Sequence, residues 1–90
     1  MKRQQFRITT RTGAEPRTGY ALGDYATHKD RGAFFWTFTH LPTGYTITTY
    51  PVHQTRASAL AHLAHLAAHG LPPHQQAAVD AVLAQQEHNQ

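Results

Sequence analysis

Polar and apolar residues alternate through the first half of the chain, and this period of two predicts β-strands. Residues 6–10 form the clearest early strand, and residues 20–28 predict a weaker one with a bulge at its Gly-Asp pair. Residues 11–19 are interpreted as a loop and residues 29–32 as a turn, because Gly, Pro and Asp gather in both. The first half is therefore expected to be a small antiparallel sheet.

The strongest strand signal is a hairpin over residues 34–50, with residues 41–44 as its turn. The turn residues favour a three-residue loop that sets Phe38 opposite Thr48, whereas the hydrophobic pattern favours Phe38 opposite Ile47. We favour the second register, because it separates two faces. One face carries Phe34, Trp36, Phe38, Tyr45 and Ile47, and the other carries Thr37, Thr39, Thr46 and Thr48 together with Phe35 and Tyr50.

The pattern changes to a helical period after the hairpin. A first helix is expected to begin at Gln54 or Thr55 and to stop at Gly70. A second helix is expected to begin near His74. The apolar stripe of the first comprises Ala59, Leu60, Leu63, Leu66 and Ala67, and the buried stripe of the second comprises Val79, Val82 and Leu83. Both helices are expected to pack on the aromatic face of the hairpin.

These elements predict an α+β fold in a single domain, residues 1–90. It has a small antiparallel sheet of three to four strands with hairpin 34–50 central, followed by two short helices packed on one face. The composition divides in the same way: all twelve Thr precede residue 56, whereas ten of the fourteen Ala follow it. The β-half covers about residues 1–52 and the helical half about residues 54–88.

Composition limits the size of the core and the kinds of site. Only sixteen of the ninety residues are Leu, Val, Ile or Phe, so the core is small and a homodimer is a reasonable expectation. The absence of cysteine excludes disulfides and thiolate metal sites. There is no secretory signal and no apolar run of membrane-spanning length, so we expect a cytoplasmic protein without a membrane partner.

Fixed positive charge is concentrated in the β-half. Seven of the eight Lys and Arg residues lie in the first 31 positions, and Arg56 is the eighth. Such asymmetry indicates either nucleic acid or an acidic protein surface as a partner, although plain solubility explains it equally well. Arg7 and Thr9 share one face of the first strand, and that face could join the Thr-rich face of the hairpin.

The helical half contains only weak candidates for a metal-binding or catalytic site. His62, His65 and His69 share one side of the first helix, and this stripe is a weak candidate for metal binding. No carboxylate or cysteine accompanies it, so we predict no metal site and no cofactor. Ser58 and His62 are four residues apart but lack the acidic member of a catalytic triad, and the five carboxylates are scattered. The chain is therefore not expected to be an enzyme.

The function favoured by the sequence is nucleic-acid binding through a basic, Thr- and aromatic-rich sheet face. Single-stranded nucleic acid is bound in this way elsewhere, with cations along its backbone and aromatic rings against its bases. The predicted binding residues are Arg3, Arg7, Arg11, Arg17, Arg31, Phe35 and Tyr50. The alternative is a protein-binding accessory or inhibitory module of the phage or mobile-element type, which uses the same face or a sheet edge.

Overall fold

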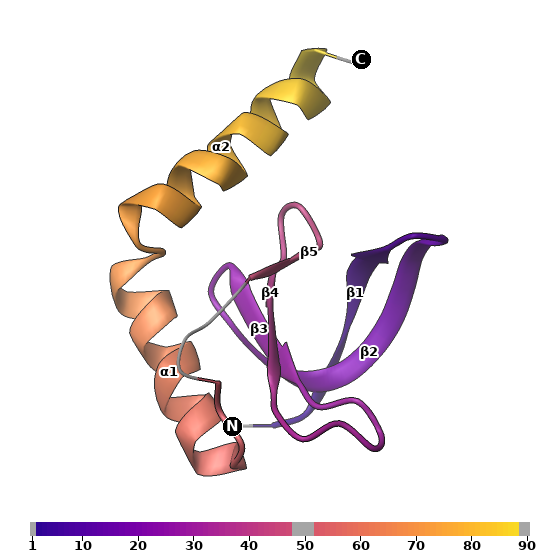
Figure 1. Ribbon diagram of the computed structural model, residues 1–90, viewed down its shortest axis with the longest axis vertical. Helices are drawn as coiled ribbons and strands as arrows, with labels where there is room; N and C mark the ends of the chain where they lie inside the picture. The colour runs from indigo at the N-terminus through magenta and orange to yellow at the C-terminus, as the bar shows by residue number, and fades with distance from the viewer. Residues whose placement is uncertain (1, 48–51, 89–90) are drawn as a thin grey trace.

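The computed structural model describes residues 2–47 and 52–88, as five strands followed by two helices (Figure 1). The strands are β1 (Gln4–Thr10), β2 (Gly13–Leu22), β3 (Tyr25–His28), β4 (Thr37–His40) and β5 (Tyr45–Ile47). The helices are α1 (Arg56–His69) and α2 (Pro73–His88). All strands are antiparallel and each pairs with the next in the chain, in the order β1-β2-β3-β4-β5.

The α+β fold expected from the sequence is confirmed, with a fifth strand that the sequence did not indicate. The extra strand is most of β2, which occupies residues 13–19 where a loop was expected. Pro16 lies opposite Arg7 in that segment. It is tolerated because β3 pairs only with residues 20–22, which leaves one side of β2 unpaired at Pro16. The expected bulge at Gly23 is instead the β2–β3 turn, where Gly23 has a φ of 61°.

The register favoured by the hydrophobic pattern is confirmed in the β4–β5 hairpin. Phe38 pairs with Ile47 across four turn residues, and the Gly44 N–H donates to the His40 carbonyl at 2.7 Å. This hairpin supplies the last two strands of the sheet and not its centre. β4 begins only at Thr37, and Trp36 before it makes an isolated bridge to His53.

One face of the sheet packs against α1, as expected. The α1 side chains of Leu63 and Leu66 are buried against Phe38 and Ile47. Thr55 caps the start of α1 by accepting a hydrogen bond from a backbone N–H of its first turn, as N-caps do. The helix ends at Gly70. α2 contributes less, because its predicted stripe of Val79, Val82 and Leu83 is only half-buried. The far end of α2 points away from the strands (Figure 1).

The sheet curls so that β1 meets the β4–β5 turn on the side opposite α1. The Thr9 N–H donates to the Gly44 carbonyl at 2.6 Å, and the Thr9 hydroxyl donates to the Thr43 carbonyl at 3.0 Å. These bonds bring β1 back to the β4–β5 turn and roll the sheet (Figure 1). Thr39 is consequently 0% exposed. The Thr-rich face is therefore closed at Thr39, whereas Thr46 of the same face is exposed.

Gly19 allows the sheet to bend at the middle of β2. A Cβ atom at this position would lie only 2.2 Å from the Thr27 carbonyl oxygen and 2.9 Å from the His28 Cβ. Only glycine lets β2 approach β3 this closely. No helix in the described part of the chain is long and apolar enough to cross a membrane.

Candidate functional site

A groove of about 480 Å³ lies between the N-terminal strands and the loop that joins β3 to β4. Its lining comes from three segments: the start of the chain, the bend of β2, and the loop with the residue before β4. The lining residues are Arg3, Thr18, Gly19, Tyr20, Lys29, Asp30, Arg31, Gly32, Ala33, Phe34 and Trp36. We call this the basic–aromatic groove. Its volume lies within the range of small-ligand sites in proteins.

Three aromatic side chains line the basic–aromatic groove. Tyr20 and Trp36 lie side by side, with ring centroids 6.2 Å apart and planes inclined by 38°. Tyr20 is 5% exposed and Trp36 is half-buried, so both are held in place by the core. Phe34 is 83% exposed, which is unusual for a large apolar ring. The groove thus combines two fixed rings with one exposed ring that is free to contact a ligand.

The charge of the basic–aromatic groove is positive. Arg3, Lys29 and Arg31 are exposed and line it, and within residues 2–47 and 52–88 no ion pair involves any of them. Asp30 is the one carboxylate among the lining residues. Its Oδ1 is already engaged by Arg17, with Nε at 3.3 Å. The groove therefore presents three cations whose charge is available to an anionic ligand.

The Tyr20 hydroxyl lies among positive groups. Arg3 hydrogen-bonds it and lowers its pKa, and Arg56 at the start of α1 acts in the same direction by a hydrogen bond and by charge. Burial opposes this shift but does not outweigh it. Two guanidinium groups, one from each half of the chain, thus approach the hydroxyl of a groove residue, Tyr20.

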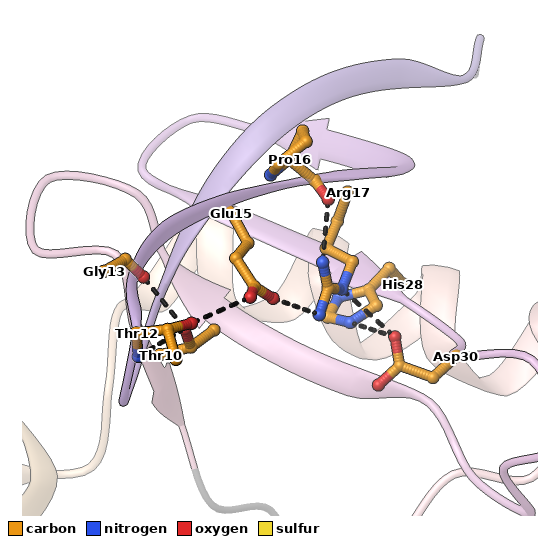
Figure 2. Close-up of polar contacts among 8 residues, drawn as sticks. All are labelled: Thr10, Thr12, Gly13, Glu15, Pro16, Arg17, His28 and Asp30. Atoms are coloured by element: carbon orange, nitrogen blue, oxygen red, sulfur yellow. Dashed lines mark hydrogen bonds and ion pairs between the residues drawn. The ribbon is translucent and has the colours of Figure 1, made fainter.

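The loop between β3 and β4, which forms one side of the groove, is held in place by a network of polar and charged side chains (Figure 2). Arg17 on β2 lies between two carboxylates: its Nη2 is 3.0 Å from Glu15 Oε2, and its Nε is 3.3 Å from Asp30 Oδ1. The same Asp30 oxygen lies 3.2 Å from Nε2 of the buried His28. The Ala33 N–H donates to the Asp30 carbonyl at 3.0 Å, which tightens the loop. Asp30 therefore fixes the segment that carries two of the groove's three cations, Lys29 and Arg31.

Neighbouring charges and burial shift the pKa of two residues in this network, Glu15 and His28. Hydrogen bonds from Arg17 and then Thr12 hold the pKa of Glu15 below its usual range. Burial lowers the pKa of His28, and Arg17 lowers it further, although Asp30 acts in the opposite direction. His28 also meets the Phe6 ring edge-on at 5.9 Å. At neutral pH the imidazole is therefore uncharged and serves as packing beneath the loop.

The structure brings together only part of the predicted set of binding residues. Arg3 and Arg31 lie in the groove, Arg7 and Arg11 are exposed outside it, and Arg17 is occupied by carboxylates. Phe35, predicted to stack on bases, is 46% exposed but does not line the groove. Tyr50 lies outside the described residues.

Sequence reasoning named only Arg3 and Arg31 among the lining residues, and it missed the aromatic and cationic residues Tyr20, Lys29, Phe34 and Trp36. A signal for the last three was present in the run from Lys29 to Trp36, where two cations are followed by three aromatic residues within eight positions. Thr9 on the Arg7 face of β1 does contact the hairpin, through the Thr43 and Gly44 carbonyls, but Thr39 of the Thr ladder is enclosed by the rolled sheet.

The histidine stripe of α1 is present and is longer than predicted. The rings of His62 and His65 are 6.1 Å apart, those of His65 and His69 are 4.7 Å apart, and His53 stacks on His62 at 4.7 Å. Among the described residues, no group of three or more His, Cys, Asp or Glu side chains is arranged to hold a metal ion. His53 also hydrogen-bonds Ser58, so it fixes the segment before α1 against that helix.

Comparisons with known proteins add no identity: no family model, no curated protein and no solved structure matches this chain.

Proposed function

We propose that the protein binds single-stranded nucleic acid in the basic–aromatic groove and has no catalytic role. The observation that supports the proposal is that three cations and an exposed aromatic ring, Phe34, line one groove, and that the cations have no ion-pair partner among the described residues. Cations bind backbone phosphates of any sequence, and an exposed ring stacks on an unpaired base. A duplex hides its bases from such a ring, which favours a single strand as ligand.

The neighbouring residues Phe34 and Phe35 allow a sharp test. Both are exposed, but only Phe34 lines the groove. In a titration of a labelled oligonucleotide at low salt, Phe34→Ala is expected to weaken binding by about 1–3 kcal/mol, the usual contribution of one stacked base. Phe35→Ala is the matched control and is expected to bind like the unaltered protein. Equal losses in both variants would contradict a site in this groove.

Salt dependence tests the contribution of the cations. If Arg3, Lys29 and Arg31 each contact a phosphate, the logarithm of the association constant is expected to fall with the logarithm of salt concentration, with a slope of about −2. Arg31→Gln should make this slope shallower, whereas Arg11→Gln, a substitution outside the groove, should leave it unchanged. The absence of any binding at low salt would refute the proposal.

A second candidate is a protein-binding module, and a separate groove favours it. An apolar groove of about 300 Å³ lies between β5 and α2. Its lining consists of Thr43, Tyr45, Thr46, Ile47, Leu71, Gln75, Ala78, Val79 and Val82, none of them charged. Apolar grooves beside a helix commonly receive another protein segment. The simplest form of this candidate is a homodimer.

Light scattering after size exclusion, at several concentrations, tests the homodimer. Concentration-dependent growth in mass that Val82→Asp abolishes would support it. Ala77→Asp, also on α2 but outside the groove lining, is the matched control. A constant monomer mass would remove this form of the candidate.

A further inference from the structure

Two arginines from opposite halves of the chain approach the hydroxyl of Tyr20, a residue that lines the basic–aromatic groove. Arg3 lies just before β1, and Arg56 is the first residue of α1. The hydrogen bond from the Trp36 N–H to the His53 carbonyl, 2.8 Å long, holds the segment before α1 beside the groove floor. Arg3 and Tyr20 both line the groove. Both guanidinium groups reach the hydroxyl of Tyr20.

This arrangement lacks a counter-charge. In the part of the chain that the structure describes, Arg17 is the only Arg or Lys residue in an ion pair, so neither Arg3 nor Arg56 meets a carboxylate. Two like charges beside one neutral phenol repel each other, and the dipole of α1 adds positive potential at Arg56. The first turn of α1 carries no acidic residue to offset that potential. An anion bound between the two arginines would remove this repulsion.

Phosphate is the anion that this set of donors fits best. A guanidinium group presents paired N–H donors that match two phosphate oxygens, and two such groups supply two positive charges. The Tyr20 hydroxyl adds a further donor, held in place because its side chain is 5% exposed and packed on Trp36. A terminal phosphate carries a charge of about −1.5 to −2 at neutral pH, whereas a phosphodiester within a strand carries one. The two arginines therefore match a terminal phosphate better than an internal one.

We infer that Arg3, Arg56 and Tyr20 form a subsite for the terminal phosphate of a nucleic-acid strand whose remaining nucleotides lie along the basic–aromatic groove. This inference rests on the proposed function and narrows its ligand to a strand with a phosphorylated end. The same chemistry is present at a 5′ or a 3′ phosphate, and the experiment below separates the two.

The test compares one oligonucleotide sequence in three forms: with a 5′ phosphate, with a 3′ phosphate, and with hydroxyl groups at both ends. One phosphorylated form is expected to bind the full-length protein about tenfold or more tightly than the hydroxyl form, because it gains charge-assisted hydrogen bonds. Arg56→Gln is expected to abolish this difference, and Arg56→Lys, which keeps the charge without the paired donors, to reduce it. Arg11→Gln is the matched control and should retain the difference.

The outcomes separate this inference from the proposed function. Equal affinity for all three forms would overturn the terminal-phosphate subsite while leaving nucleic-acid binding intact. Loss of binding for all three would overturn the proposed function instead. Inorganic phosphate then tests the subsite alone: it should raise the pH at which Tyr20 ionises, followed as the absorbance change that Tyr20→Phe removes. No change with phosphate would overturn the subsite as well.

Discussion

Arg17 and Asp30 join the middle of β2 to the loop after β3, with Arg17 Nε 3.3 Å from Asp30 Oδ1. Figure 2 shows this pair. Asp30 lines the basic–aromatic groove between Lys29 and Arg31, so the pair positions these two cations. Arg17 was expected to contact a ligand directly, but its charge is used within the protein.

Arg17→Gln is therefore expected to destabilise the protein. Both ion pairs are partly exposed, so water screens them and their joint contribution is about 1 kcal/mol. Urea unfolding followed by circular dichroism measures the difference. Arg11→Gln, at an exposed site where no ion pair is found among the described residues, is the matched control and should change the free energy of unfolding by less than about 0.5 kcal/mol. Equal effects would contradict the anchoring role of Arg17.

Stability is expected to fall in mild acid. Burial lowers the pKa of His28, His40 and His62 in the folded protein. The unfolded chain therefore binds protons first as the pH drops below about 6.5, and the free energy of unfolding decreases from there down to the lower pKa values of the folded state. Above that window the histidines are neutral in both states and stability is constant with respect to them.

Urea unfolding at roughly pH 7.5 and pH 5 tests this window. The unaltered protein should be less stable at the lower pH, and His28→Gln should lose part of that difference. The exposed His74 on α2 provides the matched control substitution. If His28→Gln changes the pH dependence no more than His74→Gln, burial of His28 is not a source of the effect.

The two helices are expected to differ in their contribution to stability. Leu63 on α1 is fully buried in the core, whereas Val82 on α2 is half-buried. Leu63→Ala leaves a cavity and should cost about 2–5 kcal/mol, a large part of the stability of a small domain. Val82→Ala should cost clearly less. Equal costs in thermal unfolding would indicate that α2 is packed as firmly as α1.

Gly19→Ala is expected to disturb the bend of β2. The added Cβ would meet the Thr27 carbonyl at 2.2 Å, so strands must move apart at a cost of about 1–3 kcal/mol or more. Gly13→Ala is a useful comparison, because no atom lies within 4 Å of its Cβ and only the backbone strain of a φ of 112° opposes it. Gly19→Ala should also weaken oligonucleotide binding, since Gly19 lines the groove. Gly13→Ala should not.

The sequence was sufficient to predict the strand register where polar and apolar residues alternate within a paired strand. Phe38 opposite Ile47 could be predicted, because a one-residue slip would expose every core residue of that hairpin. The limits of α1 were equally clear, since Thr55 and Gly70 are favourable caps at either end of a regular apolar stripe. Both signals are local, and tertiary packing did not override them.

In the curved part of the sheet, local sequence signals predicted the wrong secondary structure. Turn-forming residues between 11 and 19 indicated a loop, yet β2 pairs there with β1 because the rolled sheet gives that hairpin a place to pack. The assignment of Phe34 to the buried face of the hairpin was wrong for a related reason, whereas the assignment of Phe35 to a ligand stays a prediction. β4 begins only at Thr37, so the alternation could not be extended back to residues 34 and 35. Phe34 is the more exposed of the two.

The order of the strands bears on how the chain folds. Each strand pairs with its immediate predecessor, so every hairpin can form from neighbouring residues as soon as both of its strands exist. The Thr9–Thr43 hydrogen bond, between residues 34 positions apart, and the covering of Phe38 by α1 must come later. On a ribosome, the sheet would emerge with its apolar face bare until residues 56–69 are synthesised. Truncation before α1 should therefore yield an aggregating fragment rather than a smaller domain.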